Sequence, residues 1–331
     1  MLSGDDIGAL VLRGAGAPLV ICSVDWTGLL NAAHVKWRET LAQAAGTTPD
    51  RVAVHCVHQH NAPFVCLESQ RLCSQHDDLR SAVVDPMFFE SSLSRTAESL
   101  QKSLAASRPV TRIATSQAKV EKIAGNRRFV NAEGKISDWR GSASKNPLHQ
   151  ELPEGLIDPQ LKTVAFYDGE RRVAACHYYA THPMSYYGDG RVSSDFAGLA
   201  RKRLQENDKD CTHLYFTGCA GNVAAGKYND GTPLARQQLT DRLHAAMAES
   251  TRKLQPEPLE RIAWHTQEIV PSPRSSFAEE ALLKEIAKRE NGLANRIRPA
   301  MMLSWLRRCQ AKVPVVLSRL PMYPYSGWVD G

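Results

Sequence analysis

The sequence predicts an α/β protein, folded as a single layered domain in which helices flank a mostly parallel or mixed central sheet. Residues 18–24 and 50–58 are apolar, strand-like runs, and residues 29–46 between them have helical spacing and end at a glycine. This strand–helix–strand order is typical of a βαβ unit with parallel strands. A chain of 331 residues with 43% hydrophobic side chains can bury the core that such a unit requires.

The N-terminal third contains further regular elements. Residues 8–14 are predicted as a strand that turns through the sequence AGAP into the strand at 18–24. Residues 61–85 are polar, and we expect them to be irregular. A helix is expected at 85–107 and a strand at 110–123.

A hairpin is expected in the middle of the chain, with its strands at 162–168 and 171–182 and with Asp168 and Gly169 in its turn. The sequence has no internal repeat and no clear linker, so we expect residues 1–331 to form one domain. Beyond the hairpin, the spacing predicts helices at 195–207, 233–254 and within about 276–310, and strands at 212–218 and 261–270.

Two segments are not predicted to form regular secondary structure. Residues 125–158 are rich in Gly, Asn, Ser and Pro, and we expect a long surface excursion, which is uncommon in a compact domain unless it is functional. Residues 311–331 form an atypical tail.

Composition and charge argue against several classes of function. The formal net charge of +6 is modest, and basic residues are interleaved with acids, so nucleic-acid binding is not expected. No apolar stretch approaches the length of a transmembrane segment. The first residues carry acids where a secretory signal would be basic, so no signal peptide is visible. Localisation and oligomeric state stay open.

The eight cysteines include no C-x-x-C pair. Cys22, Cys56 and Cys176 lie in apolar, strand-like runs, where a reduced cysteine behaves as a small hydrophobic residue. Cys66 and Cys73 lie in a polar segment and are the two placed to pair. The redox compartment is therefore not determined.

Histidines gather at the end of a predicted strand, in the stretch VAVHCVHQHNAP at 52–63. Strand alternation puts His58 and His60 on one face at the C-terminal end, where open α/β sheets build their sites. A second apolar strand ends in His182 and a proline, whereas His177 faces the opposite side and is expected to be a packing or surface residue. Such imidazoles can bind one metal, or divide the work between metal ligation and proton transfer.

A glycine-rich turn follows the strand predicted at 212–218. The stretch GNVAAGK formally matches G-x-x-x-x-G-K, the loop that cradles phosphates in nucleotide-binding proteins. Tyr228 stands where that motif needs Ser or Thr, and the sequence NDGTP interrupts the helix that should follow. These two departures argue against a phosphate-loop nucleotide binder, which we keep as an alternative because the formal match exists. We expect instead that Gly221 and Asn222 bring backbone amides close to a substrate.

These elements, in this order, resemble the catalytic domain of the neutral/alkaline, non-lysosomal ceramidases, which are zinc-dependent amidases. The stretch VHQHNAP is similar to the family's THTHSGP, and NRR at 126–128 is similar to NRS. YATHPMSYYGDGRVSSDFAGLA is similar to FAIHPVSM…SDN.GYA, and GCAGNVAAGKYN to GDVSPN. The opening LVICSVDWTGL resembles the family's strand that ends in ADIG, so the similarity covers about residues 8–230.

The resemblance implies a role for four residues. His58 and His182 match the family's two zinc-binding histidines, His60 matches the histidine of acid–base chemistry, and Arg127 matches an arginine that holds the scissile carbonyl or its oxyanion. The chemistry agrees, because zinc lowers the pKa of bound water to about 7, and cationic donors stabilise a developing oxyanion. The implied cofactor is zinc, and the implied substrate is a lipid-like amide such as N-acyl sphingosine. Family members are often secreted or exported.

The sequence departs from the family at both ends. The glutamate and tyrosine that complete the family's zinc site lie on later segments that have no match here, so we expect residues 1–331 to be an incomplete catalytic domain. Asp25, Asp195 or Glu68 could supply a carboxylate ligand in their place. A non-catalytic remnant of the family that acts as a binding module is therefore the first alternative, and the phosphate-loop nucleotide binder is the second.

Overall fold

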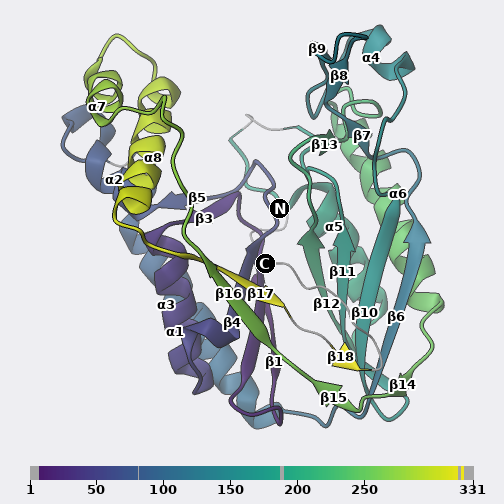
Figure 1. Cartoon of the computed structure of the whole chain (residues 1–331). Coiled ribbons are helices and arrows are strands. Elements are labelled where there is room, and N and C mark those ends of the chain that lie inside the picture. The colour runs from purple at the N-terminus through teal and green to yellow at the C-terminus, as the bar shows by residue number, and fades with distance from the viewer. Residues whose placement is uncertain (1–6, 81, 187–189, 320–321, 324–331) are drawn as a thin grey trace.

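The computed structural model describes residues 7–80, 82–186, 190–319 and 322–323, and shows two sheets that face each other between layers of helices (Figure 1). This architecture confirms the α/β class with a mixed sheet and flanking helices. The first sheet contains β1 (Ile7–Leu12), β2 (Leu19–Val24) and β4 (Val52–Cys56), in the order β1-β2-β4. The second has the order β12-β11-β10-β6-β14, and its strands are β6 (Arg112–Lys119), β10 (Gln160–Asp168), β11 (Arg171–Tyr179), β12 (Thr212–Thr217) and β14 (Glu257–Pro258).

The three-stranded sheet contains the βαβ unit that the sequence predicts. β2 pairs in parallel with β4, and helix α1 (Ala32–Ala45) connects them. The helix ends at Gly46, whose φ of 67° is the left-handed conformation that glycine adopts without strain. β1 runs antiparallel to β2. Trp26 and Trp37 are buried on the helix side of this sheet, where their rings pack edge to face at 5.1 Å.

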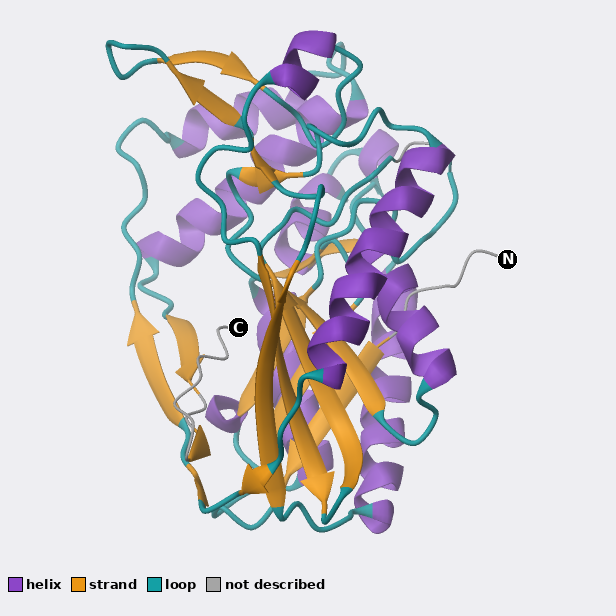
Figure 2. Cartoon of the chain, turned by 90° about the vertical axis from the view of Figure 1, so that its right-hand side faces the viewer, coloured by secondary structure: helices purple, strands orange, loops and turns teal. Residues whose placement is uncertain are grey.

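The five-stranded sheet is built around the predicted hairpin. β10 and β11 are antiparallel, and Gly169 in their turn has a φ of 59°. β12 then pairs in parallel with β11, which makes the sheet mixed. Helices α5 (Asp195–Asn207) and α6 (Pro233–Arg252) cover the outer face of this sheet (Figure 2). The side chain of Thr232 caps α6 by accepting a hydrogen bond from Ala235 N.

An apolar core joins the two sheets. Leu19 and Ile21 from β2 pack against Phe166 and Leu214 from the second sheet. Gly8 permits the close approach, because a Cβ at this position would lie 2.4 Å from Leu214 Cδ2. Burial of each large apolar side chain stabilises the fold by about 1.5–3 kcal/mol. This core sets the relative position of the strand ends above it.

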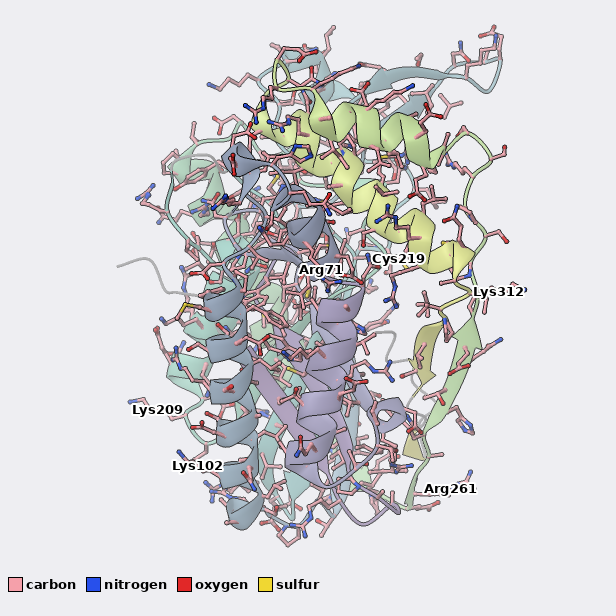
Figure 3. All side chains as sticks on the ribbon, turned by 90° about the vertical axis from the view of Figure 1, so that its left-hand side faces the viewer. Arg71, Lys102, Lys209, Cys219, Arg261 and Lys312 are labelled. Carbon is pink, nitrogen blue, oxygen red and sulfur yellow. The ribbon has the colours of Figure 1, made fainter. Side chains whose placement is uncertain are left out.

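The prediction that residues 61–85 are irregular is wrong. They contain β5 (Phe64–Cys66) and α2 (Leu67–Cys73), and α2 packs against the distant helix α8 (Leu293–Gln310). This long-range packing stabilises a short helix that its polar composition does not indicate. Cys66 and Cys73, the two cysteines that the sequence placed to pair, lie at opposite ends of α2 as buried free thiols. Figure 3 shows α8 above α1 and α3 (Pro86–Ser103), which lie side by side.

The remaining elements are short. Residues 125–158 contain several of them, and the strand predicted at 261–270 is split into two. The two predicted C-terminal helices are present, and β17 of the tail pairs with β16; residues 320–321 and 324–331 of the tail lie outside the described residues. Among the described residues, no helix combines the length and apolar character needed to cross a bilayer.

The bounds of these elements are as follows. The strands are β3 (Gly28–Leu30), β7 (Gly125–Asn126), β8 (Arg128–Val130), β9 (Ile136–Trp139), β13 (Val223–Ala224), β15 (Arg261–Ile262), β16 (His265–Ile269), β17 (Val315–Arg319) and β18 (Met322–Tyr323). The helices are α4 (Pro147–Glu151) and α7 (Glu279–Ala287), with 3-10 turns at Pro49–Arg51, Asp77–Leu79 and Leu104–Ala106.

Candidate metal centre and active site

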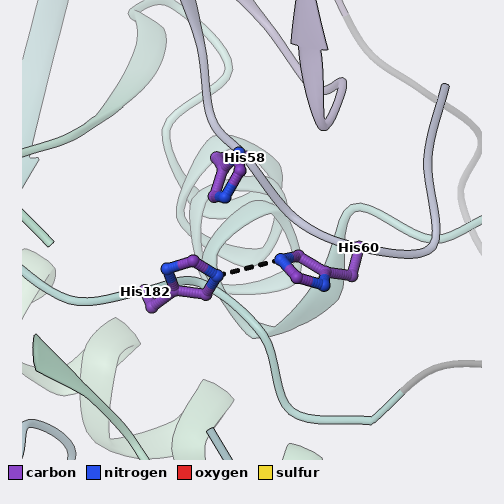
Figure 4. Close-up of side chains that lie close together, drawn as sticks. All are labelled: His58, His60 and His182. Carbon is purple, nitrogen blue, oxygen red and sulfur yellow. Dashed lines mark hydrogen bonds between the residues drawn. The ribbon is translucent and has the colours of Figure 1, made fainter. Parts of the chain in front are cut away.

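Two strand tips bring three histidines together at one end of the two sheets. His58 and His60 follow β4, and His182 follows β11, so the imidazoles come from different sheets. The ring centroid of His58 lies 5.2 Å from that of His60 and 4.7 Å from that of His182. The ring centroids of His60 and His182 are 4.9 Å apart (Figure 4). One nitrogen of each ring lies within 4.8 Å of the others, a spacing that could hold a metal ion.

A sharp turn of the backbone positions His58. β4 already ends at Cys56, and His58 has a φ of 73°, a conformation that is uncommon for a residue with a side chain. Its backbone N–H donates to Trp26 O at 2.9 Å, and its ring Nδ1 lies 2.6 Å from Thr27 O. Strand alternation therefore does not explain the shared site of His58 and His60. The Nδ1–H donor fixes the tautomer and leaves the Nε2 lone pair available.

The glycine-rich turn holds His182. The backbone N–H of His182 donates to Val223 O at 2.9 Å, and the residue forms a parallel bridge with Ala224. The backbone of Ala220 also acts on this ring, in the direction that raises its pKa. The residue is 8% exposed, and its Nε2 lies 2.9 Å from His60 Nε2. The turn therefore fixes the backbone of His182.

Burial keeps two of the imidazoles neutral at neutral pH. Desolvation, followed by the charges of His58 and Arg127, lowers the pKa of His60 to about 4. Desolvation and then the Arg127 charge lower the pKa of His182 to about 3. An imidazole must be neutral to bind a metal, so both rings can offer lone pairs at pH 7.

Arg127 places a cation beside the histidines. Its backbone N–H donates to Asn222 O at 2.8 Å, and its Nη2 donates to Ser142 Oγ. Burial lowers the pKa of the Arg127 guanidinium. Within the described part of the chain, the buried Nε of Arg127 has no hydrogen-bond acceptor. A buried donor without an acceptor is costly, which is typical of a group that meets a ligand.

A buried amide links the segments that carry Arg127 and His182. Asn229 Nδ2 donates to Ser142 O at 2.8 Å and to Ser185 O at 2.7 Å. Ser142 accepts from Arg127, and Ser185 lies three residues after His182. Asn229 itself is 1% exposed. Sequence analysis missed this residue, because an asparagine in a loop carries no signal of a long-range contact.

The three candidate carboxylates have other partners. Asp195 accepts from Ser185 N and Oγ at 3.0 and 2.6 Å, and Arg236 Nε lies 3.5 Å from its Oδ1. Asp25 forms an ion pair with Arg201 at 3.2 Å. Glu68 accepts from the backbone of α1 at 3.0 Å. Within the described residues, none of the three belongs to the histidine group.

Gly221 and Asn222 lie on the turn next to Arg127. Gly221 is exposed, with open space where a Cβ would stand, and Asn222 Oδ1 accepts from Arg128 at 3.0 Å. The turn therefore brings both residues to the edge of the site. Their expected contact with a substrate stays a prediction.

The phosphate-loop geometry is not found around Lys227. Its Nζ donates to the backbone carbonyls of Gln150 and Leu152, and α6 begins only at Pro233. A phosphate loop instead leads directly into a helix whose N-terminus faces the phosphates. The lysine thus anchors residues 150–152.

A second histidine group lies within the second sheet. His177 is a buried packing residue and not a surface residue, and its Nε2 lies 2.9 Å from His213 Nδ1. His213 Nε2 lies 3.1 Å from Asp208, which also pairs with Arg172. Asp208, Cys211 and His213 are close enough to hold a metal, but the Arg172 cation already neutralises the carboxylate. We interpret this group as a structural hydrogen-bond network.

Comparison with known proteins supports the architecture. No protein-family model matches the chain, and a search of curated proteins found no match. A ceramidase solved in complex with C2 matches with 15% identity and a TM-score of 0.60, over 80% of this chain and 41% of that chain. The neutral ceramidase from Pseudomonas aeruginosa matches with 17% identity and a TM-score of 0.61, over 80% of this chain and 42% of that chain. The fold is ceramidase-like.

The ceramidase-like architecture agrees with the motif resemblance in the sequence. The motif resemblance covers about residues 8–230, and the structural match covers 80% of this chain. The chain spans less than half the length of the two ceramidases that it matches. At identities of 15% and 17% the similarity concerns the fold, so an assignment of activity has to come from the residues of this site.

Proposed function

We propose that this protein is a zinc-dependent hydrolase of amide bonds, whose substrate is N-acyl sphingosine or a related lipid-like N-acyl amide. The observation that carries the proposal is the meeting of three imidazoles from two sheets beside the buried Nε of Arg127. Imidazole nitrogens are preferred zinc ligands, and an oxyanion needs a fixed cationic donor. The ceramidase-like fold supports the choice of an N-acyl amide.

The donor set fits zinc. His58 bonds its second nitrogen, Nδ1, to the Thr27 carbonyl, the arrangement that fixes the tautomer of a metal ligand. Two nitrogens bound to one tetrahedral zinc lie about 3.3 Å apart. Ligand nitrogens of His58, His60 and His182 all lie within 4.8 Å of one another, a spacing that can accommodate that value. We assign His58 and His182 as ligands, and His60 as the acid–base group, because amide hydrolysis needs a proton carrier close to the metal.

The chain's own residues can carry the remaining chemistry. Zinc, when bound, acts as a Lewis acid and lowers the pKa of water to about 7. Arg127 donates from Nε to the scissile carbonyl oxygen and stabilises the negative charge that develops there. His60 accepts the proton of the attacking water and delivers it to the leaving nitrogen. One water is consumed, and the products are a carboxylic acid and an amine.

Metal analysis of purified variants tests the zinc assignment. We expect His58→Ala and His182→Ala to lose bound zinc, and His60→Ala to keep zinc but lose turnover. His265→Ala, on the exposed strand β16, is the matched control and should keep both. Unchanged zinc in His58→Ala would contradict the site, and loss of zinc in His60→Ala would make His60 a third ligand.

Turnover of a labelled N-acyl sphingosine and of a short N-acyl amide tests the reaction. We expect hydrolysis that disappears with a chelator, returns with zinc and is absent in His182→Ala. The alternative is a non-catalytic binding module, which is favoured by the lack of a carboxylate in the described histidine group. Zinc binding without turnover of either amide would support that alternative.

A further inference from the structure

The β8–β9 hairpin projects from the end of the molecule that carries the site (Figures 1 and 2). It exposes several apolar side chains. Val130 pairs with Ile136, and Arg128 pairs with Trp139, so these four side chains share one face of the hairpin. Val130, Ile136 and Trp139 are 61%, 60% and 45% exposed. We call this the hairpin face. Large apolar side chains gathered on one projecting element are typical of an interaction surface.

The opposite face of the hairpin is bound to the body of the protein. Phe129 lies under the Arg140 guanidinium, with 4.9 Å between the guanidinium carbon and the ring centroid. Asp138 Oδ2 lies 3.0 Å from His149 Nε2. Arg140 is 1% exposed and donates to the His149 and Asn126 carbonyls. This buried anchor holds the hairpin in one orientation, with its apolar side outward.

The charges around the hairpin face favour an anionic partner. Arg128 and Lys135 are the exposed cations of residues 127–140, because Arg127 is partly buried in the site and Arg140 is buried on the opposite face. The same residues contain two anions, Glu133 and Asp138. Arg128 lies on the hairpin face itself, 5.1 Å from the Trp139 ring. Asp138, one of the two anions, lies on the opposite face. An exposed Trp beside arginine, with a further lysine on the same hairpin, is typical of the boundary between water and lipid.

The hairpin face is continuous with the active site. The guanidinium of Arg127 lies 5.6 Å from the Trp139 ring, so one tryptophan separates the site arginine from the exposed Val130 and Ile136. A surface that rests on this face would therefore lie close to Arg127.

We propose that the hairpin face is a membrane-docking surface that rests on an anionic phospholipid bilayer, with Trp139 and its apolar neighbours in the interface and with Arg128 and Lys135 near the lipid phosphates. The use of this docking for a lipid-like amide rests on the proposed function, but the docking itself does not. Interfacial binding of this kind scales with the apolar area buried and with the attraction of cations to anionic lipid.

Co-sedimentation with vesicles tests the proposal. The probe is phosphatidylcholine containing about 30% phosphatidylglycerol, compared with pure phosphatidylcholine. We expect Val130→Ser/Ile136→Ser/Trp139→Ser to lower the partition coefficient roughly tenfold or more. The matched control, Met87→Ser/Leu234→Ser/Leu293→Ser, changes three exposed apolar side chains elsewhere and should bind within about twofold of the wild type. Arg128→Gln/Lys135→Gln should reduce the preference for anionic vesicles.

Three outcomes would overturn docking: no vesicle binding by the wild type, equal losses in both triple variants, or a dimer in sedimentation velocity that the hairpin variant abolishes. The last result would assign the face to a second copy of the chain. Equal melting temperatures establish that the variants are folded. His58→Ala should bind vesicles like the wild type, so docking can hold even if the zinc assignment fails, and the zinc assignment can hold if docking fails.

Discussion

Arg127 is held in place by hydrogen bonds from its backbone and from Nη2, while its Nε has no acceptor within the described residues. Its backbone is bonded to the glycine-rich turn, and its Nη2 to Ser142. A preorganised donor such as this Nε is costly in the resting protein and becomes favourable when charge develops on a bound carbonyl oxygen. Burial lowers the pKa values of His60 and His182, and the Arg127 charge acts in the same direction.

Substitution of Arg127 should therefore affect the chemical step. We expect Arg127→Gln to lower kcat by roughly 10²–10³-fold, as for loss of one oxyanion donor, while the zinc content stays unchanged. Steady-state kinetics on a short, water-soluble N-acyl amide measures this without a contribution from vesicles. Arg203→Gln, an exposed α5 residue paired with Asp241, is the control. A change in KM alone would assign Arg127 to substrate binding and contradict a role in the transition state.

At the scale of single elements, the hydrogen-bond network in the second sheet makes β10, β11 and β12 sensitive to acid. His177 is fully buried, and burial lowers its pKa well below the usual value, with the charges of His213 and Arg172 acting in the same direction. Thr163 Oγ1 lies 2.9 Å from His177 Nδ1, and the pKa of His213 is also lowered by burial. The folded sheet therefore holds both imidazoles in the neutral form.

The unfolding free energy should decrease as the pH is lowered from about 6.5. The unfolded chain binds a proton to each histidine near pH 6.5, whereas the folded sheet does not, so stability is complete above that pH and is lost as the pH falls. The slope approaches about 1.4 kcal/mol per pH unit for each such histidine.

Urea denaturation at a series of pH values measures this slope. His177→Gln should be less stable at pH 8 because it disturbs the network, but its stability should depend less on pH. His265→Gln, on an exposed strand, should keep the wild-type slope. An unchanged slope in His177→Gln would show that other groups bind the protons.

At the scale of the whole molecule, the histidine group joins the two sheets. His58 and His60 extend from the first sheet and His182 from the second, above the core formed by Ile21, Phe166 and their neighbours. A metal bound by these rings would couple the two halves of the sandwich, because the ligands are close together only in the folded chain.

Zinc should accordingly stabilise the whole fold. At a free concentration about 100 times Kd, binding adds about 2.7 kcal/mol to the unfolding free energy. For a chain of this size we expect the Tm to rise by roughly 5 °C. Differential scanning calorimetry with and without a chelator measures the shift, and His58→Ala should show none. A similar shift in His58→Ala would place the zinc elsewhere.

Much of this architecture can be predicted from local patterns. The βαβ unit of β2, α1 and β4, the β10–β11 hairpin and helices α5 and α6 follow from apolar periodicity, a glycine at a helix end and a hairpin turn. His58, His60, His182 and Arg127 could be named because their residue types and spacing match a chemistry and a family of amidases. All of these signals reside in a few neighbouring residues.

The tertiary structure decided what depends on distant partners. The division into two facing sheets, the helix at Leu67–Cys73 and the links through Asn229 arise from contacts between segments far apart in the chain. The left-handed backbone of His58 and the outward direction of the hairpin face also depend on contacts between distant segments. Composition and periodicity report which residues favour burial, but the partner that buries them is determined only when the free energy of the whole packed chain is minimised.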